Sequence, residues 1–210
     1  MQNKHEWRKK EKDLYLPKNQ PEIIDVPQLK FITIQGEGSP ADSIFTDYIG
    51  ALYSLAYTIK MMPKKMDVQP KGYFDFTVYP LEGVWSINDE VIANFKGIIN
   101  KEDLVYKLMI RQPDFVDDSF YEEMLEVAKK KKNNLLLEQL NFERISEGRC
   151  VQMLHLGSFD DESASFDRME EFEKGAGLVR ISKVHREIYL SDFRKVVPEN
   201  LKTVLRFQAK

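Results

Sequence analysis

Apolar residues recur along this chain with two periods, and each period predicts a different kind of element. Spacings of three and four predict helices at about 43–62, 119–132 and 166–174. Alternating apolar and polar positions predict strands at 31–36, 73–79, 104–111, 151–156, 184–190 and 203–207, with a shorter one at 141–147. The stretch between 79 and 104 is read as a long connection.

The order of these elements is the same in two parts of the chain. Strand, helix, strand and strand follow one another over about 30–112 and again over about 150–208, and the helix at 119–132 links the two repeats. An internal repeat constrains a fold more than any single element does. We therefore expect an α+β domain over 30–210, built from two pseudo-symmetric strand-helix-strand-strand repeats.

Superposing the two repeats places Tyr79 on Tyr189 and Thr77 on Glu187. A crevice is expected where two repeats meet, and a crevice lined by aromatic rings and a few polar groups is the usual form of a small-molecule site. The repeat therefore predicts a central groove that receives tyrosines from both halves and a carboxylate from only one.

Residues 1–29 show neither period. The segment is polar and interrupted by Pro17, Pro21 and Pro27. This pattern predicts an extended N-terminal arm that lies across the domain. A partly frayed tail is the alternative.

The strand near the C-terminus has two unlike faces. Ile188 and Leu190 fall on one side, whereas His185, Glu187 and Tyr189 fall on the other. An antiparallel sheet commonly keeps one face in water, so this pattern fits a solvent-facing strand. The pattern alone favours this interpretation over the floor of a site, but the predicted groove gives the polar face a place to point and favours the second.

Charge and cysteine content exclude several classes of function. Lys and Arg total 31 against 34 for Asp and Glu, a net charge of -3, which offers no general basic surface for nucleic acid or an anionic membrane. Cys150 is the only cysteine, so no intrachain disulfide forms and a cysteine-based metal site is implausible. Neither a signal peptide nor an apolar run of spanning length is present, so we expect a cytoplasmic protein.

Two charged runs are interpreted as solvated. The four lysines at 129–132 end a predicted helix, where they complement the helix dipole. Asp160, Asp161 and Glu162 are expected to be helix-start charges and not a metal cluster, because no histidine at ligand spacing accompanies them.

Four segments resemble the GyrI-like small-molecule-binding family, and the resemblance covers about 29–207. The segments are 30–38, 76–85, 185–192 and 198–203. The resemblance implies a duplicated fold, of the type called SHS2, around a central groove that takes flat aromatic or cationic compounds. No cofactor and no metal ion are expected.

Family members act in several ways, and the resemblance leaves more than one open. Some are drug-sensing domains of transcription regulators, some associate with DNA gyrase, and a stand-alone branch hydrolyses the cyclopropane of DNA-alkylating natural products. The 29 residues before Lys30 cannot hold a helix-turn-helix. The arm and the segment around Trp85 are most similar to the stand-alone branch, so we expect a hydrolase; a non-catalytic binding or sequestering protein and a gyrase-associated protein are the alternatives.

The expected reaction assigns catalytic roles to two residues. Opening a dienone-conjugated cyclopropane with water needs a base for the water and a donor for the new phenolate oxygen. Glu187 is the candidate base, and Tyr189 or Tyr79 the candidate donor. Glu187 as a simple counter-charge for a cationic ligand, and the tyrosines as packing residues, are the alternatives.

The remaining candidates are expected to bind the ligand. Trp85, Tyr48 and Met153 offer stacking and apolar contact, while His155 and His185 are second choices for polar contact. Three of them also have an ordinary structural interpretation: Trp85 as a loop anchor, Tyr48 in the core and His155 as a satisfied structural histidine.

Overall fold

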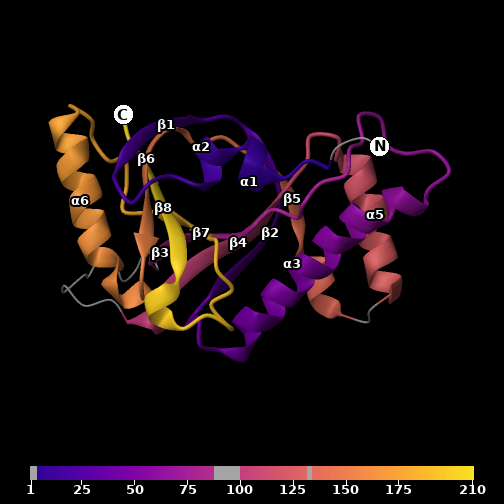
Figure 1. The fold of residues 1–210 in the computed structure, drawn as a ribbon. Helices are drawn as coiled ribbons and strands as arrows, with labels where there is room; N and C mark the ends of the chain where they lie inside the picture. The colour runs from indigo at the N-terminus through magenta and orange to yellow at the C-terminus, as the bar shows by residue number, and fades with distance from the viewer. Residues whose placement is uncertain (1–3, 88–99, 132–133) are drawn as a thin grey trace. The chain divides into compact units, whose positions relative to one another are not determined.

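The computed structural model describes residues 4–87, 100–131 and 134–210 (Figure 1). These residues divide into two compact units. The first unit contains Leu29–Tyr79 and the described part of Ile87–Ile145, together with the residues just before Trp7. The second contains Trp7–Gln28, Pro80–Ser86 and Ser146–Lys210.

The first unit is a three-stranded antiparallel sheet with two long helices. Strand β2 (Leu29–Glu37) lies between β4 (Leu104–Gln112) and β5 (Asn141–Ile145). Helix α3 (Ser43–Met61) follows β2, and α5 (Asp118–Lys131) follows β4. Short 3-10 turns stand at Pro63–Lys65, Lys101–Asp103 and Leu135–Gln139.

The helical spacing read from the sequence gives the core of this unit. Phe45, Ile49, Leu52 and Ile59 of α3 are each at most 2% exposed. Pro63 opens the 3-10 turn that follows the helix, at a position where a proline cannot continue the helical hydrogen bonding. The predicted end of the second helix, residue 132, lies outside the described residues.

The strand predicted at 73–79 is wrong. Only Phe76 in this segment makes a strand-like bridge, to His5, and the strand of this region is β3 (Leu81–Ile87). Phe76 and Tyr79 are 1% and 2% exposed, so apolar side chains do point inward at intervals. The alternation of apolar and polar residues at 73–79 thus reflects burial of alternate side chains and not pairing of a strand. The strand lies instead in the stretch around Trp85, which was expected to be a long connection.

The second unit is a five-stranded antiparallel sheet in the order β1-β6-β8-β7-β3. The four strands besides β3 are β1 (Glu22–Val26), β6 (Gly148–Leu156), β7 (His185–Tyr189) and β8 (Lys202–Gln208). Helix α6 (Glu162–Gly175) follows the 3-10 turn Phe159–Asp161, and another 3-10 turn, Pro198–Asn200, precedes β8.

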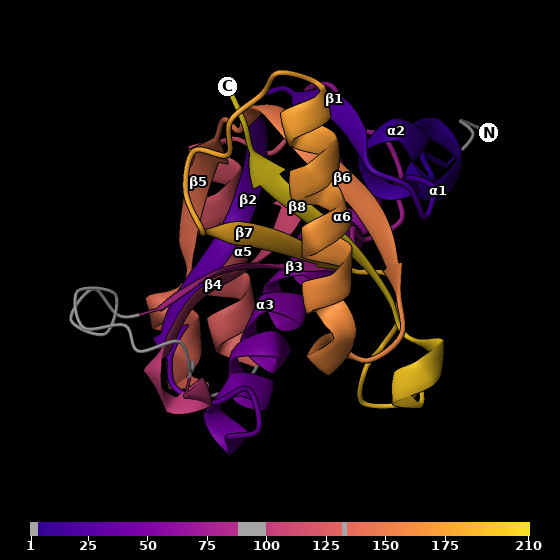
Figure 2. The ribbon, with the colours of Figure 1, turned by 90° about the vertical axis from the view of Figure 1, so that its left-hand side faces the viewer.

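Helix α6 covers one face of this sheet (Figure 2). Its Met169 packs with Met153 of β6 and with Leu205 and Phe207 of β8, all at most 1% exposed. Side chains at odd-numbered positions of β6, β7 and β8 therefore face the helix, because alternate residues of a strand point to the same side.

Residues of the N-terminal arm lie on the other face. They form two short helices, α1 (Trp7–Lys10) and α2 (Lys12–Tyr15), before strand β1 pairs with β6. Arg206 donates to the Leu14 carbonyl at 2.6 Å, and Gln152 donates to the Asp13 carbonyl at 2.7 Å. The arm is thus tied to the sheet by backbone acceptors as well as by a strand.

The α+β fold with two repeats is confirmed, but the predicted superposition is wrong in one element. Strand, helix, strand and strand occur as β2-α3-β3-β4 and as β6-α6-β7-β8. Strand β3 is therefore the counterpart of β7, so Tyr79 is not the counterpart of Tyr189. In the β3–β7 pair Trp85 lies opposite His185, and Gly83 lies opposite Glu187. The central groove implied by the resemblance stays a prediction.

Candidate functional site

The polar face of β7 is buried and its side chains contact one another. The Tyr189 hydroxyl donates to Oε2 of Glu187 at 2.8 Å, and Nε2 of His185 lies 3.2 Å from Oε1 of the same carboxylate. Glu187 and Tyr189 are each 8% exposed. This strand is therefore not the ordinary solvent-facing strand that its alternation also allowed.

Trp85 extends this hydrogen-bond chain from the neighbouring strand. Its indole N–H donates to the Tyr189 oxygen at 2.9 Å, so Tyr189 accepts from Trp85 and donates to Glu187. Between the two rings lies Gly83, where an added Cβ would be 2.7 Å from Trp85 Nε1 and 3.0 Å from the Tyr189 oxygen. The missing side chain at Gly83 leaves the space in which the two polar ring atoms meet.

Glu162, at the start of α6, brings a second carboxyl group to Glu187. The two side chains are hydrogen-bonded, and Glu162 is 7% exposed. Burial, followed by the charge of Glu187, raises the pKa of Glu162 to about 10. Glu162 is therefore protonated at neutral pH, and its expected role as a solvated helix-start charge is wrong.

Tyr189 also stays protonated at neutral pH. Burial raises its pKa well above the ordinary value for a tyrosine, and the adjacent Glu187 carboxylate raises it further. The phenol is therefore a hydrogen-bond donor across the usual pH range. It positions the Glu187 carboxylate from one side, while His185 contacts it from the other.

Aromatic rings that the sequence reading did not single out surround this cluster. Phe159 and Phe193 pack edge-on against Tyr189 at centroid distances of 5.9 and 5.7 Å, and Phe166 packs edge-on against His185 at 4.8 Å. Phe159 is 37% exposed, so this aromatic wall reaches the surface. Phe166 lies at the start of the helix predicted at 166–174, and an apolar residue at helical spacing indicates a core residue as readily as a ligand contact.

Glu162, His185 and Glu187 are residue types that bind metal ions, and one ligand atom from each lies within 4.8 Å of the others. The hydrogen bond between the two carboxyl groups requires a proton, which a bound cation would displace. The arrangement in this structure therefore fits a shared proton.

His155 and Met153, both expected to contact a ligand, have structural environments. The His155 ring nitrogens lie 2.9 Å from Ser165 Oγ and 2.9 Å from the Ser158 carbonyl, which ties β6 to the beginning of α6. Met153 is fully buried against Met169 in the core under α6. These contacts fit a structural histidine and a packing methionine, and a role of either residue in ligand binding stays a prediction.

Tyr48 and Tyr79 belong to the first unit, whereas Glu187 and its hydrogen-bond partners belong to the second. Tyr48 is half-buried on α3. Tyr79 is 2% exposed, and the Arg111 guanidinium lies 4.6 Å from its ring centroid. Their roles in ligand binding stay predictions.

The opposite face of β7 carries a buried ionic network. Arg186 contacts Glu82 at 2.7 Å and Glu147 at 3.1 Å, and Arg206 contacts Glu147 at 3.2 Å. Burial raises the pKa of Glu82, against the opposing effect of Arg186. This network holds β3, β7 and β8 in place directly behind the Glu187 cluster.

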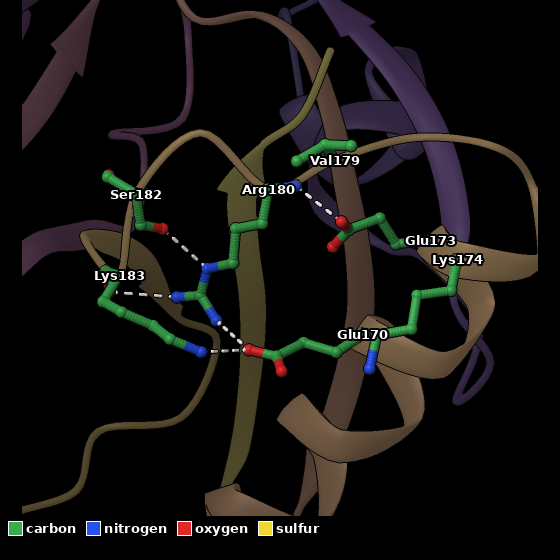
Figure 3. Close-up of a pocket in the computed structure, with 7 residues that line it drawn as sticks. All are labelled: Glu170, Glu173, Lys174, Val179, Arg180, Ser182 and Lys183. Carbon is green, nitrogen blue, oxygen red and sulfur yellow. Dashed lines mark hydrogen bonds and ion pairs between the residues drawn. The ribbon is translucent and has the colours of Figure 1, made fainter.

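A separate surface pocket lies at the far end of α6 (Figure 3). Its lining is formed by Glu170, Glu173, Lys174, Val179, Arg180, Ser182 and Lys183. Glu170 accepts from both Arg180 and Lys183, at 2.9 and 2.7 Å, and Glu173 accepts from the Arg180 backbone N–H. Both glutamates are therefore already engaged by neighbouring donors, and none of the expected site residues lines this pocket.

Comparisons with known proteins show the family and the fold of the chain. A GyrI-like small-molecule-binding domain model matches residues 19–210. A hydrolase from Listeria innocua of known structure is 36% identical with a TM-score of 0.88, over 99% of this chain and 100% of its own. An uncharacterised conserved protein from the same organism is 37% identical with a TM-score of 0.87, over 99% and 100% of the two chains.

More distant proteins share the fold alone. The C-terminal domain of EcmrR is 13% identical with a TM-score of 0.51, over 91% of this chain and 97% of its own. No curated protein matches the sequence. Within the described ranges, no helix has the length and apolar character needed to cross a membrane. The match over residues 19–210 establishes that the chain belongs to the GyrI-like small-molecule-binding family.

Proposed function

We propose that this protein binds planar aromatic or cationic compounds at the cluster of Trp85, Glu187 and Tyr189 and hydrolyses the electrophilic cyclopropane of DNA-alkylating natural products. The observation that carries the proposal is the Glu187 carboxylate, buried among aromatic rings and held by donors on both of its oxygens. The similarity to a hydrolase at 36% identity supports a hydrolytic activity.

The proposed reaction uses Glu187 as a general base. Glu187 takes a proton from water as the water oxygen bonds to the ring carbon. The electrons of the breaking carbon–carbon bond pass through the dienone to its carbonyl oxygen, which is protonated to a phenol. Atoms and charge balance: water loses one proton to Glu187, the phenolate gains one proton, and the net reaction adds one water to the compound.

Tyr189 positions the base in this scheme. Its hydroxyl is already bonded to Glu187 and is supported from behind by the Trp85 N–H. A phenol can also turn toward the developing phenolate oxygen of the substrate, where a hydrogen bond strengthens as charge accumulates. Either role needs the hydroxyl and not only the ring.

Binding without turnover is the second candidate function. A buried carboxylate next to the rings of Tyr189, Phe159 and Phe193 is also a suitable environment for an organic cation, which interacts favourably with aromatic faces and with negative charge. Association with DNA gyrase stays a prediction from the resemblance.

Product mass separates the two candidates. The protein is incubated with a cyclopropane-containing alkylator, and the compound is followed by mass spectrometry. Hydrolysis adds the mass of one water, and the gain disappears in Glu187→Gln. Glu170→Gln, a carboxylate change at the far end of α6, is the matched control and retains turnover. Saturable binding with an unchanged compound mass would contradict the enzymatic proposal and support the binding protein.

A further inference from the structure

Two carboxyl groups in contact raise the question of where their proton lies. Glu162 and Glu187 are 7% and 8% exposed, a carboxylate oxygen of each lies within 4.8 Å of the other, and the two side chains are hydrogen-bonded. Two ionised carboxylates have no proton to share and repel each other strongly away from water. The contact therefore requires one neutral carboxylic acid and one carboxylate.

The surroundings of the two groups identify the neutral one. Glu187 receives the Tyr189 hydroxyl on Oε2 and faces His185 on Oε1, and these contacts stabilise negative charge. Glu162 has no such support: its Oε1 is buried without a hydrogen-bond partner among the residues that the structure describes. The hydrogen bond of the Glu162 carboxyl group is made with Glu187 itself, so the shared proton is more stable on Glu162 than on Glu187.

We propose that Glu162 is a positioning residue of this site: it holds the proton of a carboxylic acid–carboxylate pair and donates that hydrogen bond to Glu187. The pair then carries one negative charge instead of two. Glu162 orients the Glu187 carboxylate from the α6 side, while Tyr189 and His185 orient it from β7.

The charged neighbours leave this assignment intact. Asp160, in the turn before α6, adds a further negative charge that favours protonation of Glu162. On the two strands beside β7, the residues opposite Glu187 are Gly83 and Leu205, which carry no charge. Within the described cluster, His185 is the group that can bring positive charge, and it contacts Glu187.

The consequence for the reaction rests on the proposed function. When Glu187 takes a proton from water, the pair briefly holds two protons. It returns one when the phenolate is protonated, and a single shared proton remains at the end of the turnover. If Glu162 were ionised, Glu187 would lose the hydrogen-bond donor on its α6 side. The Glu187 carboxylate would then turn away from the position of the attacking water.

Infrared spectroscopy tests the assignment on the protein without substrate. Wild-type protein at neutral pH is expected to show a protonated carboxyl C=O band that titrates only near pH 10. Glu162→Gln removes this band, whereas Glu173→Gln, a similarly buried glutamate of the same helix, retains it. Absence of the band from folded wild-type protein, or its persistence in Glu162→Gln, overturns the proposal.

Kinetics give a second, separate readout. Glu162→Gln keeps a neutral hydrogen-bond donor, so its kcat at neutral pH stays within about threefold of wild type, and the alkaline loss of activity near pH 10 disappears. Glu162→Ala removes the donor and lowers kcat by about tenfold or more with a smaller change in KM. Equal losses in both variants contradict a donor role. Because the infrared experiment needs no substrate, failure to find turnover leaves its result standing.

Discussion

The Tyr189 hydroxyl donates to Oε2 of Glu187 over 2.8 Å, although the two residues are neighbours on one face of a single strand. A strand projects residues i and i+2 to the same side, so β7 alone can place a phenol beside a carboxylate. Both residues are buried, and the Trp85 N–H donates to the same tyrosine oxygen. The orientation of Glu187 therefore depends on one hydroxyl group, which can be removed without removing the ring.

Tyr189→Phe removes that hydroxyl. The Glu187 carboxylate loses one donor and the buried Trp85 N–H loses its acceptor, so we expect kcat to fall by about tenfold to a hundredfold and stability to fall by about 1–2 kcal/mol. Turnover by mass spectrometry and chemical denaturation measure the two effects. Tyr121→Phe is the matched control, because its hydroxyl donates to the Leu140 carbonyl in the other unit. Equal activity losses in both variants would contradict a specific role for Tyr189.

Gly83→Ala tests the space between Trp85 and Tyr189. The new Cβ would lie 2.7 Å from Trp85 Nε1, closer than side-chain atoms tolerate, so the indole has to move and its hydrogen bond to Tyr189 breaks. We expect ligand affinity to fall by about tenfold, measured by calorimetry with a planar cationic dye. Gly50→Ala, where an added Cβ meets nothing within 4 Å, should leave affinity unchanged. Unchanged affinity in Gly83→Ala would show that ligand binding does not require the hydrogen bond between Trp85 and Tyr189.

Arg206→Met tests the buried network behind the site. Arg206 donates to Gln152, Glu147 and the Leu14 carbonyl, and removing it leaves a buried carboxylate with less compensation. We expect a loss of about 3 kcal/mol in unfolding free energy and faster proteolysis of the N-terminal arm. Arg149→Met, which breaks an exposed pair with Asp25, should cost less than about 1 kcal/mol. Similar costs for the two variants would contradict a buried, structural network.

The sequence pattern predicted the repeat and the shared face of His185, Glu187 and Tyr189, because both follow from local periodicity. It failed where tertiary packing decides. Glu162 looked like any acidic residue at a helix start, and only the packing of α6 over the sheet buries it against Glu187. Met153 looked available for a ligand, and the same packing encloses it in the core.

The error at 73–79 has a different physical cause. Phe76 points into the core and is bridged only to His5, so burial at alternate positions imitated a strand. The true strand begins after Pro80 and contains Gly83, a residue that normally weakens strands. Here the close approach of Trp85 and Tyr189 requires the glycine, and a single sequence gives no sign of that contact.

Glu162→Gln is expected to change how stability depends on pH. Because the folded-state pKa of Glu162 is raised to about 10, wild-type stability from this group is fully present below the unfolded-state pKa and is lost as pH rises toward the folded value. Glutamine does not ionise, so the variant escapes that loss. Relative to wild type, its unfolding free energy should rise by at least about 1 kcal/mol between pH 5 and pH 8, measured by denaturant titration at each pH.

Glu170→Gln provides the opposite sign on the same helix. The hydrogen bond from Lys183, with further help from Arg180, lowers the pKa of Glu170, so this carboxylate contributes stability above its unfolded-state pKa and loses it as pH falls. The variant should therefore be less stable than wild type at pH 7, and the difference should shrink toward pH 3. Parallel pH profiles for the two variants would mean that Glu162 is ionised in the folded protein, since only a buried neutral acid makes the two glutamates of one helix respond in opposite directions.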